Sequence, residues 1–62
     1  MVNRLREFRE KLNWSQTKLA EVSGVSRVTI NQIESGKVQT AKTDTLTKLA
    51  DALNEKVTTI FF

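Results

Sequence analysis

Residues 15–36, SQTKLAEVSGVSRVTINQIESG, determine how the chain folds because they carry start and stop signals for two short helices. Ser15 offers a hydroxyl that can cap a helix start. Gly24 can take the left-handed backbone conformation that commonly follows a helix end. We therefore predict that the first of the two helices covers residues 15–23.

The second helix of the stretch has equally clear boundaries. Ser26 is a favourable N-terminal cap, and Gly36 can close the helix at its other end. A helix is therefore predicted over residues 27–35, about two turns long like the one before it. Two such helices, joined by a short turn that contains glycine, are typical of a helix-turn-helix unit, which here spans residues 15–36.

The two faces of the helix predicted over residues 27–35 differ in chemistry. At roughly 100° per residue, Ile30, Ile33 and Glu34 fall on one side. The other side has no acid and carries amide, hydroxyl and methyl groups, on Val28, Asn31, Gln32 and Ser35. Amides and hydroxyls can read base edges, and a methyl group can contact the methyl of thymine. This outer face therefore has the chemistry of a surface that reads DNA.

Length and composition exclude several classes of protein. Sixty-two residues allow one small domain, residues 1–62, with a modest core. The chain has no Cys and no His, which removes disulfides, thiol nucleophiles and the usual zinc ligands. With no obvious carboxylate pair in a pocket either, we expect no enzyme, no catalytic residue, no metal and no cofactor.

The chain shows no sign of a membrane or secretory segment. No apolar run is long enough to span a bilayer, and there is no secretory leader. We therefore expect a soluble, cytoplasmic protein of a bacterial or phage-infected cell, with no membrane and no small-molecule substrate as a partner. The Met start and the compact ending favour an intact regulator, and a domain cut from a longer chain is the alternative.

The charge balance favours an anionic partner only weakly. Ten Lys and Arg against seven Asp and Glu give a net charge of +3. An ordinary, slightly basic domain would have the same total, so the placement of the charges matters more. No acid lies between Glu34 and Asp44, whereas Lys37 and Lys42 do. This basic segment directly follows the second helix of the helix-turn-helix unit.

A helix is also predicted ahead of the unit, over residues 2–12. One side of it carries the i, i+3, i+4, i+7 spacing of a core-facing stripe, on Leu5, Phe8, Arg9 and Leu12. Asn3 can cap its start, and Asn13 can end it in a left-handed conformation. Trp14 is expected to fill the core between this helix and the next, and a stacking platform for a base is the alternative.

Two further helices are predicted after the basic segment. Thr43 or Asp44 should cap a fourth helix that ends at Leu53. Residues 57–62 favour a strand by propensity, but a lone strand has nothing to pair with, so we expect a short fifth helix. Its Phe61 should help to close the core. The predicted fold class is all-α, a compact five-helix domain.

Two charged residues fall where apolar ones are expected. Arg9 lies on the inner stripe of the first helix, and Glu34 lies on the inner edge of the third. An isolated charge in either place would be costly, so we predict that the two side chains form a structural ion pair. Such a pair is weak evidence for stability, and its role would be to orient the third helix against the first. Arg9 could also offer a spare donor to a phosphate.

The order of these residues resembles a known family. The quoted series is Leu5, Arg9, Trp14-Ser15-Gln16, Leu19-Ala20, Gly24-Val25-Ser26, Thr29-Ile30, Ile33-Glu34-Ser35-Gly36-Lys37, Leu46, Leu49-Ala50 and Ala52-Leu53. It is similar to the phage repressor and Cro type of helix-turn-helix domain, also called XRE-like, over about residues 4–61. The resemblance implies a lambda-repressor-like DNA-binding domain that binds operator DNA, mostly as a homodimer.

The resemblance also implies roles for individual residues. The positions that match base-reading ones are Arg27, Val28 and Gln32, with Asn31 as an extra contact on the exposed side. The positions that match phosphate-binding ones are Gln16, Thr17, Thr29, Ser35, Lys37 and Lys42. Gln16 would also brace the recognition helix, residues 27–35. Each of these side chains could instead be an ordinary solvated surface group.

The expected partners are inferred from the same resemblance and from the apolar C-terminal residues. An exposed apolar end can be a surface for self-association, so we expect a homodimer through Val57, Phe61 and Phe62. The dimer would bind near-palindromic double-stranded DNA and block transcription as a Cro-like or repressor-like regulator, which needs no catalytic group. The alternative is an antitoxin or another protein-interaction module that uses the same fold.

Overall fold

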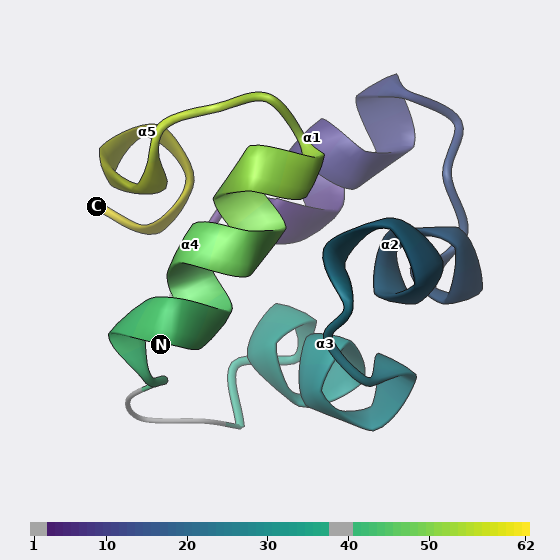
Figure 1. Ribbon diagram of the computed structural model, residues 1–62, viewed down its shortest axis with the longest axis horizontal. Helices are drawn as coiled ribbons and strands as arrows, with labels where there is room; N and C mark the ends of the chain where they lie inside the picture. The colour runs from purple at the N-terminus through teal and green to yellow at the C-terminus, as the bar shows by residue number, and fades with distance from the viewer. Residues whose placement is uncertain (1–2, 38–40) are drawn as a thin grey trace.

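Helices and their connecting turns make up the part of the chain that the structure describes. The computed structural model describes residues 3–37 and 41–62, which contain five helices and no strand. The helices are α1 (Leu5–Lys11), α2 (Gln16–Ser23), α3 (Arg27–Glu34), α4 (Thr43–Ala52) and α5 (Val57–Phe61). This confirms the all-α, five-helix fold, including the choice of a helix over a strand for the tail (Figure 1).

The turn between α2 and α3 forms as the sequence predicts. The Ser15 hydroxyl accepts a hydrogen bond from the backbone N–H of Lys18 at 3.0 Å, which caps α2. Gly24 ends α2 in the left-handed region, with φ of +76°. The Ser26 hydroxyl then accepts from the backbone N–H of Thr29 at 3.2 Å and caps α3. These local signals therefore set the boundaries of both helices.

The first helix is shorter than predicted. It covers Leu5–Lys11, and residue 2 lies outside the described residues. The side-chain oxygen of Asn3 accepts from the Leu5 backbone N–H at 3.0 Å, and Asn13 is left-handed at φ of +58°, both as expected. Leu12 was wrongly placed on the core stripe. It follows the last residue of α1 and is 45% exposed, because the chain has already left the helical path.

The start of α4 also differs from the prediction. Lys42 is the N-cap residue, and its side chain makes no capping hydrogen bond. Thr43 is already the first helical residue, so neither it nor Asp44 caps the helix. The Asp44 carboxylate instead lies in the first turn, where the helix dipole favours negative charge. The helix ends at Ala52, one residue before the predicted end.

Apolar side chains from all five helices, from the turn before α3 and from the C-cap of α4 form one core. Its buried members are Leu5, Leu19, Val25, Ile30, Ile33, Leu46, Leu49, Ala50, Leu53, Ile60 and Phe61. The helix pairs in closest contact are α2 with α3 and with α4, α5 with α4 and with α1, and α1 with α3. Trp14 is half-buried against this core, as predicted for a packing residue.

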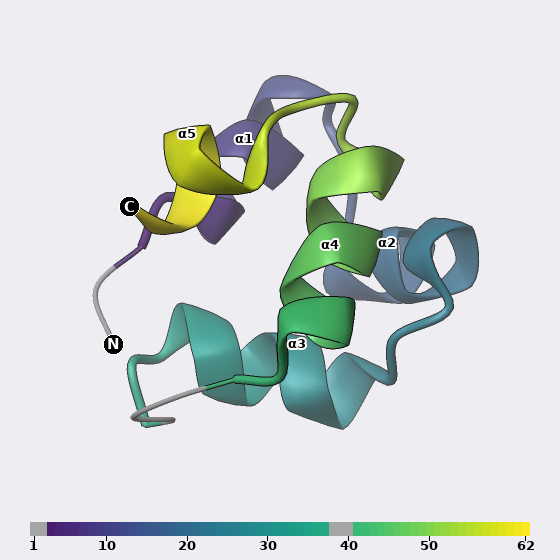
Figure 2. The ribbon, with the colours of Figure 1, turned by 60° about the vertical axis from the view of Figure 1, so that its left-hand side comes forward.

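Helices α5 and α3 lie at opposite ends of the fold. Figure 2 shows α5 beside α1 and α4, while α3 runs along the opposite end of the molecule. Phe61 is 5% exposed and belongs to the core, whereas the next residue, Phe62, is 86% exposed. In the part of the chain that is described, no helix has the length and apolarity needed to cross a membrane.

Candidate nucleic-acid interface

Helix α3 buries one face and presents the other to solvent. Ile30 and Ile33 are completely buried in the core. On the other side Val28 is 64% exposed, and Arg27, Asn31 and Gln32 are also exposed. The outward face therefore carries a guanidinium, two amides and a β-branched methyl-bearing side chain. Burial of Ile30 and Ile33 leaves α3 no freedom to turn this face inward.

A shallow open hollow lies over this face. Its lining residues are Gln16, Arg27, Val28, Asn31, Gln32 and Lys37. They come from the start of α2, from α3 and from the segment just after α3. Every one of them is a residue that the sequence predicts to contact DNA, so the fold brings these distant positions to one surface. The hollow combines two positive charges with three amides and no acid.

The other predicted phosphate contacts lie outside the lining of this hollow. Thr17 is exposed in the first turn of α2, and Lys42 is exposed at the N-cap of α4. Thr29 is half-buried, and its hydroxyl accepts from the Ser26 hydroxyl at 2.9 Å. The Ser35 hydroxyl donates to the Gln32 backbone carbonyl at 3.1 Å. The Thr29 and Ser35 hydroxyls therefore already make hydrogen bonds near the start and the end of α3.

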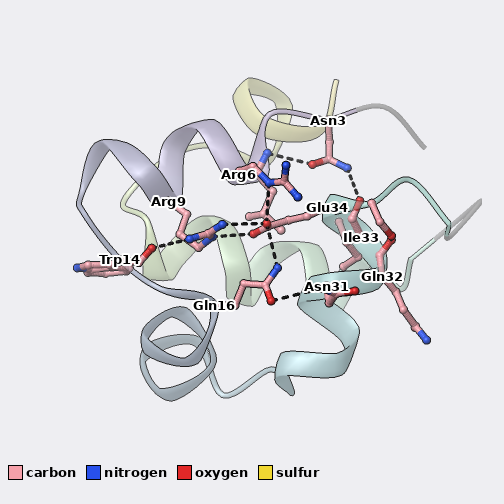
Figure 3. Close-up of polar contacts among 11 residues, drawn as sticks. Asn3, Arg6, Arg9, Trp14, Gln16, Asn31, Gln32, Ile33 and Glu34 are labelled. Carbon is pink, nitrogen blue, oxygen red and sulfur yellow. Dashed lines mark hydrogen bonds and ion pairs between the residues drawn. The ribbon is translucent and has the colours of Figure 1, made fainter.

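The Glu34 carboxylate lies behind the hollow and joins three helices (Figure 3). The Arg9 guanidinium donates through Nε to Glu34 Oε2 at 2.8 Å and through Nη2 to Oε1 at 3.0 Å. Gln16 Nε2 and Arg6 Nε also donate to Oε1, at 3.2 and 3.3 Å. Side chains from α1 and α2 thus hold the last residue of α3. Arg9 and Glu34 form the ion pair expected from their positions in the sequence.

The Glu34 carboxylate determines which way the side-chain amides of Gln16 and Asn31 point. An ionised carboxylate only accepts hydrogen bonds, so Gln16 must turn its NH₂ group toward Glu34. The Gln16 carbonyl oxygen then accepts from Asn31 Nδ2 at 3.4 Å. Asn31 in turn directs its own carbonyl oxygen away from Gln16. The ion pair is therefore connected to the outer face of α3 by an ordered chain of hydrogen bonds.

Burial and hydrogen bonding act on Glu34 in opposite directions. Desolvation by burial raises the pKa of the Glu34 carboxyl, and hydrogen bonds from Arg9, Gln16 and Arg6 lower it more, so its net pKa lies below the ordinary value. The hydrogen bond to Glu34 raises the pKa of Arg9. Both groups are therefore held in their charged forms, although the side chain of Glu34 is fully buried.

Sequence reasoning missed two members of this network. It placed no role on Arg6, although Arg6 precedes Arg9 by three residues and so lies on the same side of α1. It also missed the Asn3 amide, which donates to the backbone carbonyl of Ile33 at 3.0 Å and ties the start of α1 to the end of α3. Helical spacing could have indicated Arg6, but no local signal indicates the contact of Asn3.

Together, the fold and this surface define a class of protein. Two short helices joined at a glycine turn, with the second exposing an acid-free, amide-rich face, are a helix-turn-helix DNA-binding unit. A family model described as helix-turn-helix matches residues 5–60. The chain belongs to this family, the Cro/C1 or XRE type, which is a non-catalytic family of DNA-binding domains. It matches no curated protein.

The Arg9 and Arg6 side chains should differ sharply in their importance for stability. Arg9→Ala leaves the buried Glu34 carboxylate without its closest donors, and we expect a loss of about 3 kcal/mol in the free energy of unfolding. The Arg6 side chain is 59% exposed, so Arg6→Ala should cost at most about 1 kcal/mol. Urea unfolding followed by circular dichroism measures both. Equal losses would contradict a structural role for the buried pair.

The lowered pKa of Glu34 predicts a stability that depends on pH. The unfolded chain takes up this proton at a higher pH than the folded chain does. The contribution of Glu34 is therefore complete above the ordinary glutamate range and is lost as the pH falls through the folded-state pKa. The difference in unfolding free energy between the wild type and Glu34→Gln should be largest at neutral pH and should shrink as the pH falls below the ordinary glutamate range. A difference independent of pH would contradict this.

Proposed function

We propose that this chain, residues 1–62, acts as one domain that binds double-stranded DNA in a sequence-specific way and regulates transcription as a Cro-like or repressor-like protein. The observation that carries the proposal is the solvent-facing side of α3, where Val28 is 64% exposed among amides and no acid. Contact with a thymine methyl in a DNA groove would explain why an apolar β-branched side chain is exposed in that position.

Base reading is proposed for four residues of α3. Arg27 lies in the first turn and can reach guanine O6 and N7 with its forked guanidinium. Val28 would contact a thymine methyl, and the amides of Gln32 and Asn31 would pair with donors and acceptors on base edges. The carbonyl of Asn31 points away from Gln16, which supports a role for Asn31 as an acceptor in the groove.

Phosphate contacts are proposed around these four residues. Lys37 and Gln16 line the same hollow as the base-reading residues, so the Lys37 ammonium would face the DNA backbone when α3 enters the groove. The Gln16 NH₂ group already donates one hydrogen to Glu34, so its second hydrogen would make the phosphate contact. The remaining proposed contacts are Thr17, Thr29, Ser35 and Lys42. Such contacts would position the protein on the duplex without selecting its sequence. Backbone N–H groups at the starts of α2 and α3 would strengthen this grip.

A homodimer is proposed as the form that binds an operator. Val57 is half-buried, Phe61 is 5% exposed and Phe62 is 86% exposed, so Phe62 offers most of the apolar surface and Phe61 would support it from within the core. Two copies would place their recognition helices about 34 Å apart, one turn of DNA, on a near-palindromic site. Occupation of that site would block transcription in the cytoplasm of the host cell.

Replacing Lys37 and replacing Gln32 should have different effects on DNA binding. Lys37→Ala removes a phosphate contact, so the slope of log affinity against log salt should fall by about 0.9 for each bound chain, at every sequence. Gln32→Ala should instead relax one or two base positions, at a cost of about 1–3 kcal/mol there. Duplexes selected from a random pool, then titrated at several salt concentrations, measure both effects.

Two outcomes of these titrations would count against the proposal. A change of sequence preference on Lys37→Ala would show that the contacts are sorted wrongly. No salt-sensitive binding of any duplex by the wild type would favour the alternative, an antitoxin or another module that uses the fold to bind a protein.

The dimer is tested by sedimentation equilibrium with and without operator DNA. We expect the wild type to reach a dimer on the operator, and Phe62→Ser to shift the equilibrium toward the monomer because it removes exposed apolar surface. Lys56→Ser, a change on the polar surface just before α5, is the matched control and should leave the equilibrium unchanged. A strictly monomeric wild type at high concentration, both free and on DNA, would overturn the dimer.

A further inference from the structure

We propose that Arg6, on α1, is an additional residue that binds the DNA phosphate backbone, beside the surface formed by α2 and α3. The inference rests on the proposed function, because it extends the same DNA-binding surface onto a third helix. Its ligand is a phosphodiester oxygen, and its contribution would be to affinity and orientation rather than to the choice of sequence.

The position of Arg6 follows from an atom that it shares with the edge of the proposed DNA surface. Arg6 Nε donates to Glu34 Oε1 at 3.3 Å, and Gln16 Nε2 donates to the same oxygen at 3.2 Å. Gln16 also lines the hollow over the outer face of α3. Figure 3 shows the Arg6 and Gln16 side chains approaching Glu34 from different helices. Arg6 therefore donates to the same Glu34 oxygen as a residue that lines the hollow.

The charges around Glu34 leave one positive charge uncompensated. Arg9 engages both carboxylate oxygens, at 2.8 and 3.0 Å, and forms the closer of the two ion pairs. Arg6 is the second guanidinium on a carboxylate that can neutralise only one. The cluster of Arg6, Arg9 and Glu34 thus carries a net charge of +1, and Arg6 holds that charge on the side of the cluster that faces solvent.

Arg6 also has donors available, whereas Arg9 has few that solvent can reach. Arg9 is 8% exposed, and it uses Nε and Nη2 on Glu34 and Nη1 on the backbone carbonyl of Trp14. The Arg6 side chain is 59% exposed and contacts Glu34 through Nε. Within residues 3–37 and 41–62, no acceptor contacts its Nη groups. A guanidinium fork with two free nitrogens suits a phosphate.

Two other cations, one at the N-cap of α1 and one at its last residue, make contacts elsewhere. Arg4 pairs with Glu7 at 2.7 Å, and its guanidinium lies over the ring of Phe8 at 4.9 Å. The Lys11 ammonium lies over the same ring at 4.6 Å. Both side chains thus gather around Phe8 rather than around Glu34. Arg4 is accordingly a matched control for Arg6, since it is an exposed, ion-paired arginine at the N-cap of the same helix.

The salt dependence of operator binding tests the proposal. Arg6→Gln should lower the slope of log affinity against log salt by about 0.9 for each bound chain, equally for operator and unrelated duplexes. Arg6→Lys should keep the slope, because it keeps the charge. Arg4→Gln should leave the slope unchanged. Thermal unfolding by circular dichroism would verify that all three variants are folded at the temperature of the titrations.

Each contrary outcome has its own meaning. If Arg6→Gln weakens binding but keeps the wild-type slope, Arg6 only supports Glu34 and the proposal is overturned. If Arg6→Gln and Arg4→Gln lower the slope equally, the effect is that of overall charge, and the proposal is again overturned. If the wild type binds no duplex in a salt-dependent way, the proposed function fails together with this inference.

Discussion

A single buried carboxylate constrains the arrangement of the first three helices. The Glu34 side chain is fully buried, and Arg9 and Arg6 from α1 and Gln16 from α2 donate to it. Desolvation offsets much of the attraction in such a cluster, so its main effect is geometric rather than stabilising. The carboxylate is satisfied only when the end of α3 meets both partner helices. It therefore restricts the angle at which α3 packs against α1 and α2.

That constraint matters because α3 is too short to hold its own shape. A helix of eight residues is marginal in water and depends on tertiary packing. Its two ends are held by different means, by the Ser26 cap at the start and by Glu34 at the last residue. The contact of Asn3 with the Ile33 carbonyl adds a third attachment. A surface that reads base edges needs this rigidity, because its side chains must meet the groove in one register.

The accuracy of prediction from sequence depended on how local each signal was. The caps at Ser15 and Ser26 and the left-handed Gly24 and Asn13 were predictable, because each depends on neighbouring backbone groups. The two errors are also local. At Leu12 the apolar pattern was extended past the last residue of α1, and at α4 the first residue of the helix was misplaced. Periodicity alone does not mark such residues.

The network around Glu34 was only half predictable for a different reason. A charge on an apolar stripe requires a partner, and that requirement was enough to pair Arg9 with Glu34. It does not limit the number of donors that a carboxylate with four lone-pair positions accepts. The resemblance predicted that Gln16 braces the recognition helix, and spacing along α1 places Arg6 on the same side as Arg9. That both donate to one oxygen of Glu34 depends on how α1 and α2 approach α3 in space. Sequence spacing within one helix does not contain that information.

The two terminal phenylalanines differ in burial, and this difference links the core to the proposed dimer contact. Phe61 fills the core between α5 and its neighbours, so the exposed Phe62 is held by a residue that cannot move without opening the core. Figures 1 and 2 both place α5 beside α1 and α4 and away from α3. A second chain seated on Phe62 would therefore leave Val28 and Gln32 uncovered. The proposed dimer contact and the proposed DNA contact would therefore be compatible, because they would use different faces of one small core.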